Sequence, residues 1–312
     1  MINNFDQLIH EAKKIAHCKK QAFRVAVAAG DDKAAIEAIR EAKEMGLADA
    51  VLVGEKKLIL ETLDALDIQP DEFEIIHAEG ESEICRQTIQ IIKSGQADLI
   101  LKGKIKSATL LKAILNKECG LRTGKLISDA YLFEWPNRPS ENKLMIITDG
   151  GFNLTPDLEQ KIQIIENAVH VAHALGNENP KVAVLSAVET VNPALPATID
   201  AAVLTKMNER GQITGCLIDG PLALDNAVSE EAAKIKNLHS PVAGKADILL
   251  FPGIESANLT AKATLYFSNF RLAHATMGAQ VPVLIPSRAE SADAKLCTLA
   301  LNVILAEHSK RQ

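Results

Sequence analysis

The sequence has few aromatic residues and no excess of positive charge. Aromatic residues make up 4% of its 312 residues, with a single Trp and two Tyr. The formal net charge is -6, so the chain has no long-range positive field that would attract nucleic acid or an anionic lipid surface. We therefore expect neither a nucleic-acid partner nor a membrane partner, and we expect any anionic ligand to bind at a local site.

The sequence also lacks paired cysteines and an uninterrupted apolar segment near its start. Residues 1–20 alternate charged and apolar side chains at helical spacing, which indicates neither a signal peptide nor a membrane span. The cysteines form no C-x-x-C pair and are odd in number, a pattern typical of reduced thiols. They are Cys18, Cys85, Cys119, Cys216 and Cys297. These features predict a cytoplasmic protein.

Two nucleotide-binding motifs are missing. No G-x-G-x-x-G sequence follows an apolar run. The segment GLRTGKL at 120–126 is similar to a phosphate-binding P-loop, but it has one residue too few between its glycines and no Ser or Thr after Lys125. Both absences disfavour a nicotinamide cofactor and a nucleoside triphosphate.

Short aliphatic runs recur along the chain, and helical patterns separate them. Hydrophobic residues make up 47% of the sequence and charged residues 24%. Apolar runs that end in Gly, Asp or Pro and precede helical patterns such as 158–175 and 291–307 are typical of βαβ units, whose parallel strands are buried on both faces. We therefore predict an α/β fold with mostly parallel strands, at 24–29, 50–53, 73–76, 98–101, 144–148, 182–186, 215–218, 248–251 and 281–285.

One polar stretch interrupts this rhythm. Residues 126–143 contain the single Trp135 together with Pro136 and Pro139, and we expect the chain to cross between two domains there. In open α/β sheets, ligands bind beyond the carboxyl ends of the strands, where loops and helix N-termini meet. The residues predicted at those ends are 30–31, 102–104, 149–151, 186–189, 219–221, 252–253 and 286–288.

Several longer phrases carry a family resemblance. Residues 184–229 include S-A-V-E-T-V-N-P, T-I-D-A-A, R-G-Q-I-T-G-C and D-G-P-L-A-L-D-N-A. These phrases resemble the phosphate acetyl/butyryltransferase family, and they are closest to its phosphate butyryltransferases. Further matches lie at 101–125, 242–258 and 282–295, so the resemblance covers most of residues 97–305.

The resemblance implies a fold like that of isocitrate and isopropylmalate dehydrogenases. In such a fold, two α/β domains with mostly parallel sheets form an interdomain cleft that holds the active site. The implied first domain comprises residues 1–135 plus 288–312, and the inserted second domain comprises residues 136–287. The family is usually homodimeric, so a homodimer or a higher homo-oligomer is expected.

The implied reaction is butanoyl-CoA plus phosphate giving butanoyl phosphate plus coenzyme A, with phosphate acetyltransferase activity as the alternative. The expected partners are acyl-CoA and phosphate; coenzyme A is a substrate, and neither a tightly bound cofactor nor a metal is expected. Phosphate is itself a nucleophile, so the protein must align it with the thioester carbonyl and supply positive charge.

The resemblance assigns the catalytic roles to Ser287, Arg288 and Asp293. The planar fork of Arg288 suits phosphate, and Ser287 resembles the family serine that hydrogen-bonds the developing charge; helix capping is the alternative for Ser287. Asp293 is the candidate base for the coenzyme A thiol. It lies one position earlier than in the acetyltransferase pattern, with Glu290 nearby, and an ordinary first-turn acid is the alternative.

Two groups of residues are predicted to bind substrate. The first lies at a strand-to-helix turn and on the loop that follows, where a solvated basic surface with Ser107 as a helix cap is the alternative; its members are Lys102, Lys104, Ser107, Thr109 and Arg122. The second belongs to the second-domain phrases and comprises Asp219, Asn226 and Asn258. Asp219 and Asp225 also suggest a metal site, although a turn and a helix cap explain both acids equally well.

Two other classes of function remain open. A metal- and nicotinamide-dependent dehydrogenase of the same fold needs an arginine cluster for its substrate, which the sequence lacks. A non-catalytic sensor of coenzyme A or acyl phosphate is disfavoured by the presence of Ser287 and Arg288, but the fold alone does not exclude it.

Overall fold

The computed structural model describes residues 1–19, 22–135, 143–286 and 290–311. The backbone forms two compact units, which we treat separately. Unit 1 comprises Met1–Phe5 and Leu126–Leu272, and unit 2 comprises Asp6–Lys125 and Ala273–Gln312. The predicted domain bounds, after residue 135 and after residue 287, stay a prediction, because compactness alone does not define an independently folding domain.

Unit 2 contains a mostly parallel sheet with the strand order β3-β2-β1-β4-β11-β10. Apart from β10, which runs antiparallel to β11, the neighbouring strands are parallel. The short aliphatic runs of the sequence are buried here because helices cover the sheet on both faces. The strands are β1 (Phe23–Ala28), β2 (Ala48–Gly54), β3 (Glu74–His77), β4 (Leu99–Lys102), β10 (Leu272–Met277) and β11 (Val283–Leu284).

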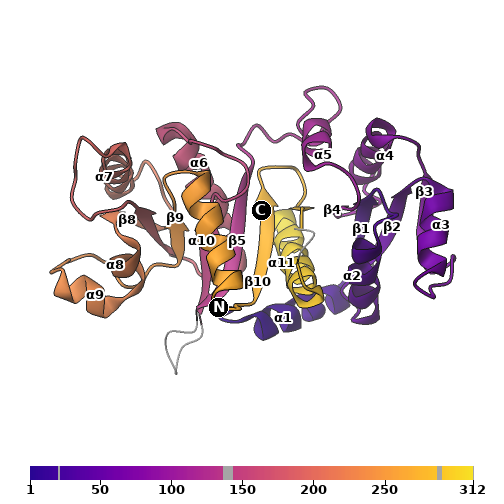
Figure 1. Ribbon diagram of the computed structural model, residues 1–312, viewed down its shortest axis with the longest axis horizontal. Helices are drawn as coiled ribbons and strands as arrows, with labels where there is room; N and C mark the ends of the chain where they lie inside the picture. Colours follow the sequence, from indigo (N-terminus) through magenta and orange to yellow (C-terminus); the bar gives the residue numbers. More distant parts are fainter. Residues whose placement is uncertain (20–21, 136–142, 287–289, 312) are drawn as a thin grey trace. The chain divides into compact units, whose positions relative to one another are not determined.

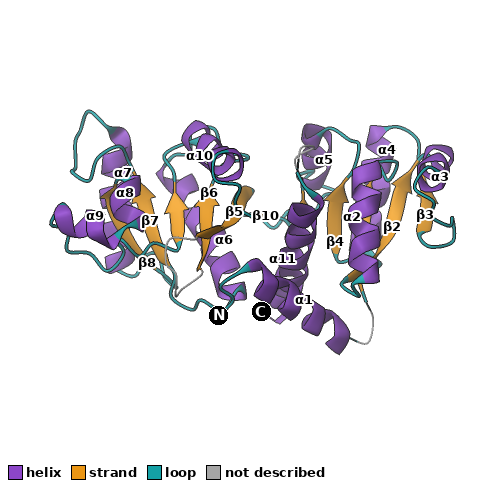
Figure 2. Ribbon diagram, turned by 60° about the horizontal axis from the view of Figure 1, so that its bottom comes forward, coloured by secondary structure: helices purple, strands orange, loops and turns teal. Residues whose placement is uncertain are grey.

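The helices of unit 2 form two layers. Helix α2 packs against α11, whereas α4 packs against α5 and against β1 and β2; Figure 2 shows α2 and α11 in front of the strands. A buried cluster that includes Ile89 and Ile92 of α4 and Leu110 of α5 lies between the second layer and the sheet. The helices are α1 (Phe5–Cys18), α2 (Lys33–Glu44), α3 (Lys56–Asp64), α4 (Glu81–Lys93), α5 (Ser107–Ile114) and α11 (Ala292–Arg311).

The strands of unit 1 are also mostly parallel and follow the order β5-β6-β9-β7-β8. Only β5 is antiparallel to its neighbour β6. The strands are β5 (Ser128–Trp135), β6 (Lys143–Thr148), β7 (Lys181–Leu185), β8 (Leu217–Leu222) and β9 (Ile248–Leu250).

Helices also cover both faces of the sheet in unit 1. Helix α6 packs on β5, β6 and β9 next to α7, whereas α10 packs on β6 and α8 on β7. Figure 1 shows α7 on one side of β8 and β9, and α8 and α9 on the other. The helices are α6 (Leu158–Ala174), α7 (Pro196–Glu209), α8 (Leu224–Val228), α9 (Glu230–Ile235) and α10 (Ile254–Tyr266). The predicted α/β fold with mostly parallel strands is therefore confirmed.

Two strands, β5 and β10, were not predicted from the sequence, and each has an antiparallel neighbour. The prediction of a polar break at 126–143 is wrong for Ser128–Trp135, which form β5. Tyr131, Phe133 and Trp135 lie two residues apart in this strand, and their rings contact one another in sequence along it. Residues 130–133 are all apolar and buried, so the strand contains a short apolar run between polar residues. The antiparallel strand β10 was missed as well.

Strand β8 continues further than the apolar pattern predicts. It was expected at 215–218, but it spans Leu217–Leu222. Asp219 therefore lies inside a strand, and its predicted place in a loop after the strand end is wrong. Pro221 has no N–H group to donate to a ladder, and it is tolerated because β8 is the last strand in the order of unit 1.

Two further observations concern the cysteines and the possibility of a membrane-spanning helix. The five cysteines are all free thiols, and burial raises the pKa of Cys85 and of Cys216 to about 11, with a nearby Glu81 adding to the effect on Cys85. None of the helices within the described ranges combines the length and the apolar character that crossing a membrane requires.

Candidate active site

The turn after β4 is held against the end of the neighbouring strand β1. The N–H of Gly103 donates to the carbonyl of Ala28 at 2.8 Å, and the N–H of Lys104 donates to the carbonyl of Ala29 at 3.3 Å. The ammonium group of Lys102 donates to the carbonyls of Gly103 and Ile105 at 3.1 and 3.2 Å. The side chain of Lys104 is exposed. Two lysines are therefore placed at the carboxyl ends of adjacent parallel strands.

The first turn of α5 follows directly. Ser107 is the first residue of this helix, and Lys106 occupies the capping position, so the alternative in which Ser107 caps the helix is wrong. The hydroxyl of Thr109 donates to the carboxylate of Glu81 on α4 at 2.8 Å. The structure thus brings Lys102, Lys104 and Ser107 together, whereas the hydroxyl of Thr109 already has a partner. Substrate binding by these residues stays a prediction.

Arg122 is fixed beside the segment that links β10 to β11. It forms a β-bridge with Ala279, and its carbonyl accepts a hydrogen bond from the side chain of Gln280 at 3.1 Å. The hydroxyl of the next residue, Thr123, donates to the carbonyl of Gly278 at 2.6 Å. The backbone around Arg122 is therefore well anchored, while its side chain is exposed. Its predicted contact with substrate stays a prediction.

Two of the three predicted catalytic residues, Ser287 and Arg288, lie outside the described residues. The third, Asp293, lies in the first turn of α11 and is exposed. Its carboxylate accepts a weak hydrogen bond from the thiol of Cys297, with 3.9 Å between oxygen and sulfur. This location is compatible with both roles considered for Asp293, a general base and an ordinary acid in the first turn of a helix. The catalytic role of Asp293 therefore stays a prediction.

A histidine–glutamate pair that sequence reasoning did not identify lies at the same end of the unit 2 sheet. Glu290 is buried, and its carboxylate is 2.8 Å from Nε2 of His274 on β10. The backbone of His274 accepts from Asn302 and donates to the hydroxyl of Thr298, both on α11. No signal in the sequence could have joined these residues, since the pairing depends on how α11 packs.

The strand register gives the level of His274 within the sheet. Thr276 of β10 lies opposite Val283 of β11, and Val283 lies beside Ile100 of β4. Extending this register by two residues places His274 level with Lys102, at the carboxyl ends of β4 and β11. His274 is therefore a further polar residue at the end of the sheet where the predicted substrate lysines lie.

In unit 1, the carboxylate of Asp149 organises the loop that follows β6. Asp149 is 3% exposed and accepts hydrogen bonds from the backbone N–H groups of Asp129, Gly151, Phe152 and Asn153, at 2.9 to 3.3 Å, and from the side chain of Asn153. Burial raises the pKa of Asp149, against the lowering effect of these donors, and the nearby Asp129 adds to the increase. The carboxylate thus holds the D-G-G-F-N turn in one conformation.

Asn258 supports the same turn, whereas Asn226 and Asp219 lie elsewhere. The side-chain amide of Asn258 donates to the carbonyl of Gly150 at 2.9 Å. Asn226 is fully buried and donates to the carboxylate of Glu189, in the loop after β7, at 3.2 Å. The carboxylate of Asp219 accepts from the N–H of Gly220 at 2.8 Å. All three have structural partners, and their predicted contacts with substrate stay predictions.

The acids of unit 1 that the structure describes do not gather into a metal site. Asp225 forms an ion pair with Lys236, 3.1 Å away, and the hydrogen bond from this lysine lowers the pKa of Asp225. His173 on α6 is hydrogen-bonded at 2.8 Å to the carbonyl of Gly215. Within residues 1–19, 22–135, 143–286 and 290–311, no group of three His, Cys, Asp or Glu side chains could hold a metal ion. The expected independence from metal stays a prediction.

Replacing Asp149 with Ala is expected to lower the free energy of unfolding by about 3 kcal/mol, because several buried N–H donors would lose their acceptor. Asp149→Asn should cost less, since the amide keeps one acceptor oxygen. Urea denaturation followed by circular dichroism measures both. Asp225→Ala is the control, because it removes a carboxylate that is 55% exposed and should change the stability by less than about 1 kcal/mol. Equal losses for the Asp149→Ala and Asp225→Ala variants would contradict the organising role of Asp149.

Comparison with known protein families gives a match over most of the chain. The sequence model of the family described as "Phosphate acetyl/butaryl transferase" matches residues 5–90 and 83–303. The phosphate butyryltransferase of Clostridium acetobutylicum is 42% identical over 306 residues, which cover 98% of this chain and 99% of that protein. The phosphate acetyltransferase of Thermotoga maritima is 42% identical over 294 residues, covering 94% of this chain and 99% of that protein.

Solved structures give a consistent result. A branched-chain phosphotransacylase from Enterococcus faecalis superimposes with a TM-score of 0.81 at 28% sequence identity. The superposition covers 92% of this chain and 99% of that protein. Sequence and backbone similarity therefore extend over nearly the whole length of these proteins.

Proposed function

Because the chain belongs to the phosphate acetyl/butaryl transferase family, we propose that it moves a short acyl group between coenzyme A and inorganic phosphate. The observation that carries this proposal is the 42% identity with phosphate butyryltransferase over 98% of the chain. Lys102 at the end of β4 and Lys104 in the turn that follows agree with it, because a phosphate substrate needs positive charge at such a position.

The proposed chemistry needs no covalent enzyme intermediate. An oxygen of phosphate attacks the carbonyl carbon of the thioester, the carbon–sulfur bond breaks, and the proton of hydrogen phosphate balances the departing thiolate. Arg288 and Ser287 are proposed to stabilise the charge that develops on the carbonyl oxygen. In the reverse direction Asp293 is proposed to accept the thiol proton of coenzyme A, because the thiolate is the nucleophile.

We propose butyryl as the preferred acyl group, with acetyl as the alternative. The preference for butyryl rests on the S-A-V-E-T-V-N-P and L-A-L-D-N-A motifs. Overall identity does not decide between the two acyl groups, because a phosphate butyryltransferase and a phosphate acetyltransferase are each 42% identical to this chain. Two additional methylene groups contribute about 1.6 kcal/mol when they are buried. One or two side chains in the acyl pocket are therefore enough to reverse the preference.

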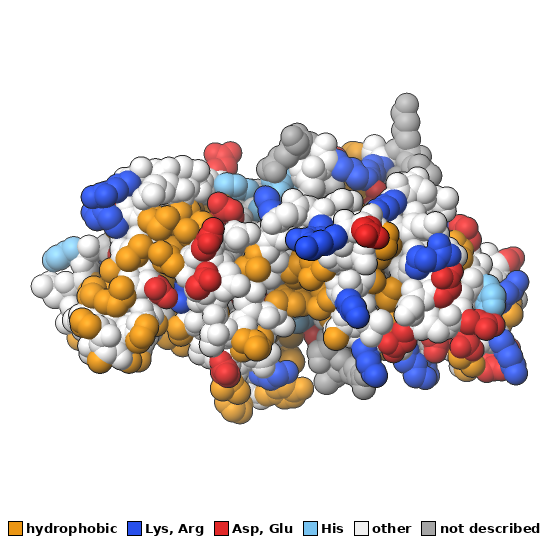
Figure 3. Space-filling view, turned by 90° about the horizontal axis from the view of Figure 1, so that it is seen from above, with side chains coloured by type: hydrophobic (Ala, Val, Ile, Leu, Met, Phe, Trp, Pro, Cys, Tyr) orange, Lys and Arg blue, Asp and Glu red, His pale blue; other side chains and the backbone are white. Residues whose placement is uncertain are grey.

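A cytoplasmic location and a homodimer complete the proposal. Unit 1 exposes apolar side chains on neighbouring turns of α7, where Ile199 and Val203 are 37% and 38% exposed. Hydrophobic side chains gather on the part of unit 1 that carries α7 (Figures 1 and 3). A second copy of the chain would remove such surface from water.

The purified protein incubated with phosphate and acyl-CoAs from acetyl to hexanoyl is expected to release free thiol, with the highest kcat/KM for butyryl-CoA. Thiol release is measured with and without phosphate, so hydrolysis is subtracted. A maximum at acetyl-CoA would make the alternative correct. A lack of phosphate-dependent release with every donor would refute the proposed function and favour the non-catalytic sensor, and turnover of a 2-hydroxy acid with NAD would favour the dehydrogenase.

A further inference from the structure

A pocket in unit 2 lies where the predicted phosphate-binding turn and the start of α11 meet. Its walls come from α2, β4, the end of β11 and α11, and most of them are apolar; the lining includes Ala34, Ala38, Leu101, Leu284 and Leu299. Among the described residues, the ionisable side chains that line it are Asp32, Lys102 and Lys295. Pro286, the residue directly before Ser287, lines the pocket as well. The pocket is thus bounded by Lys102, which is predicted to bind phosphate, and by Pro286, which precedes the predicted catalytic serine in the sequence.

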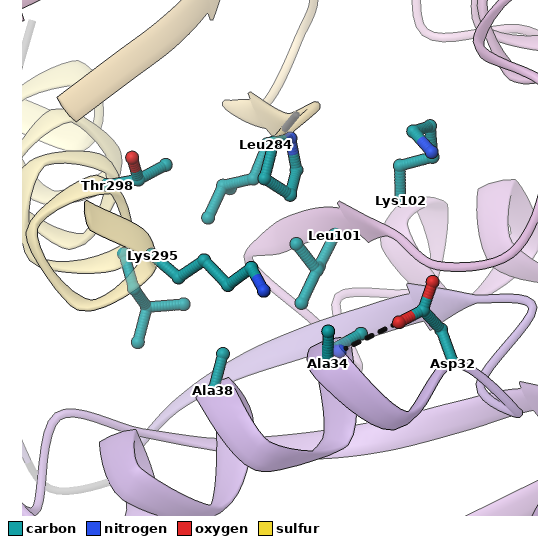
Figure 4. Close-up of a pocket in the computed structure, with 11 residues that line it drawn as sticks. Asp32, Ala34, Ala38, Leu101, Lys102, Leu284, Lys295 and Thr298 are labelled. Carbon is teal, nitrogen blue, oxygen red and sulfur yellow. Dashed lines mark hydrogen bonds between the residues drawn. The ribbon is translucent and has the colours of Figure 1, made fainter. Parts of the chain in front are cut away.

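Lys295 extends into this pocket. It belongs to the first turns of α11, and its side chain crosses from α11 towards α2 and ends near Ala34 (Figure 4). The residue is only partly exposed. Its ammonium group forms no ion pair with a carboxylate in the part of the chain that the structure describes. A half-buried cation beside apolar walls lacks part of its hydration, so an anion at this position would stabilise it.

Asp32, the acid that lines the pocket in the described part of the chain, already has a structural role. The carboxylate of Asp32 caps α2 by accepting a hydrogen bond from the N–H of Ala35 at 3.1 Å (Figure 4). Lys102 and Lys295 are both positively charged, whereas Asp32 alone is negatively charged. The described ionisable groups of the lining therefore carry a net positive charge. The combination suits an anion that is larger than a single carboxylate and that fits several donors, and a phosphate group has these properties.

We propose that Lys295 is a substrate-binding residue that contacts a phosphate group in this pocket. The proposal rests on the proposed transfer between coenzyme A and phosphate. The phosphate group belongs either to inorganic phosphate and the acyl phosphate, or to coenzyme A itself, which carries phosphate groups of its own. Both sources present the phosphate oxygens that Lys295 would contact. Separate measurements of the KM for phosphate and the KM for the acyl-CoA distinguish the two sources.

The test compares Lys295→Met, which keeps an unbranched apolar side chain and removes the charge, with Lys295→Arg, which keeps the charge. Lys93→Met is the control, because Lys93 is an exposed lysine in the last turn of α4 in the same unit. The KM for phosphate and the KM for the acyl-CoA are measured separately. We expect Lys295→Met to raise one of them about tenfold or more, the loss expected for one charge-assisted hydrogen bond, and Lys295→Arg to recover part of it.

The substrate whose KM changes identifies the source of the phosphate group. A change confined to phosphate assigns the site to inorganic phosphate, and a change confined to the acyl-CoA assigns it to coenzyme A. In the second case, dephospho-acyl-CoA tells which phosphate is bound: the variant and the unmodified protein become equal with it if Lys295 contacts the 3′-phosphate. KM values within twofold of those of Lys93→Met for both substrates would overturn the proposal.

A binding measurement keeps this result separate from the outcome for the proposed function. Inorganic phosphate and coenzyme A are each titrated against the three variants while the midpoint of thermal unfolding is followed. Stabilisation by either ligand that is lost in Lys295→Met and kept in Lys93→Met supports the site even if no acyl-CoA is turned over. Equal stabilisation of both variants rejects it even if the enzyme proves active. Circular dichroism of the unliganded variants checks that Lys295→Met is folded.

Discussion

Arg288→Ala is expected to lower kcat for phosphate-dependent thiol release by about 10²- to 10³-fold, while the protein remains folded. The family resemblance places Arg288 directly after Ser287 in P-S-R. A guanidinium group can bind two oxygens of phosphate at once and can stabilise charge that develops during acyl transfer. Loss of one positioned donor of this kind typically costs two to three orders of magnitude in rate. Steady-state kinetics with butyryl-CoA and phosphate measure the effect.

Two variants control for charge and for general damage to the fold. Arg288→Lys keeps the positive charge but not the bidentate geometry, so we expect an activity between that of Arg288→Ala and that of the unmodified protein. Arg40→Ala removes an exposed arginine of α2 that pairs with Glu44 within the same helix, and it should leave kcat unchanged. Near-normal activity of Arg288→Ala would show that the catalytic site has been assigned to the wrong residues.

Gly103→Ala is expected to lower the free energy of unfolding by about 3 kcal/mol, because the position has no room for a side chain. A Cβ atom at residue 103 would lie 2.1 Å from the carbonyl oxygen of Ala29 and 2.9 Å from that of Ala28. These are backbone atoms at the end of β1, so they cannot turn aside as a flexible side chain does. The turn after β4 would have to move away, and the hydrogen bonds of residues 103 and 104 to β1 would break.

The matched control for Gly103→Ala is Gly95→Ala in the same unit. Gly95 has a φ of 71° and nothing within 4 Å of an added Cβ, so Ala there meets only the backbone cost of the left-handed conformation, about 1–2 kcal/mol. Urea unfolding of both variants separates steric exclusion from conformational preference. We also expect Gly103→Ala, but not Gly95→Ala, to raise the KM for phosphate, because Lys102 and Lys104 flank the displaced residue. A Gly103→Ala protein as stable as Gly95→Ala would contradict the argument.

The candidate site could be predicted from the sequence in part. Lys102, Lys104 and Ser107 are close in the chain, and they lie together around the start of α5. Arg288 and Ser287 were identified from family phrases, and they lie outside the described residues. Thr109 faces Glu81 of another helix, which no local pattern could indicate. Glu290 was noted as a neighbour of Asp293, but its partner His274, which is 16 residues away, was not found.

The sequence by itself determined the parallel strands of this protein and the two helices predicted at 158–175 and 291–307. A strand that is buried on both faces is apolar over most of its length, so 98–101 and 144–148 could be identified as strands from their composition alone. Strand β5 was not identified, because its short apolar run at 130–133 lies between the polar residues Ser128, Asp129 and Glu134. The resemblance of longer sequence motifs to a known family then indicated the chemistry, because a match over many residues is more specific than a short motif.

Only the tertiary structure decided which distant side chains meet. The buried carboxylate of Asp149 gathers donors from two segments that are 20 residues apart, and Lys295 shares a pocket with Lys102, which lies on a strand far earlier in the chain. Such contacts depend on strand order and on how helices pack against the sheet, and a single sequence carries neither in its local periodicity. The burial of a strand or helix is therefore visible in the local order of apolar and polar residues, whereas contacts between polar groups that are distant in the sequence are not.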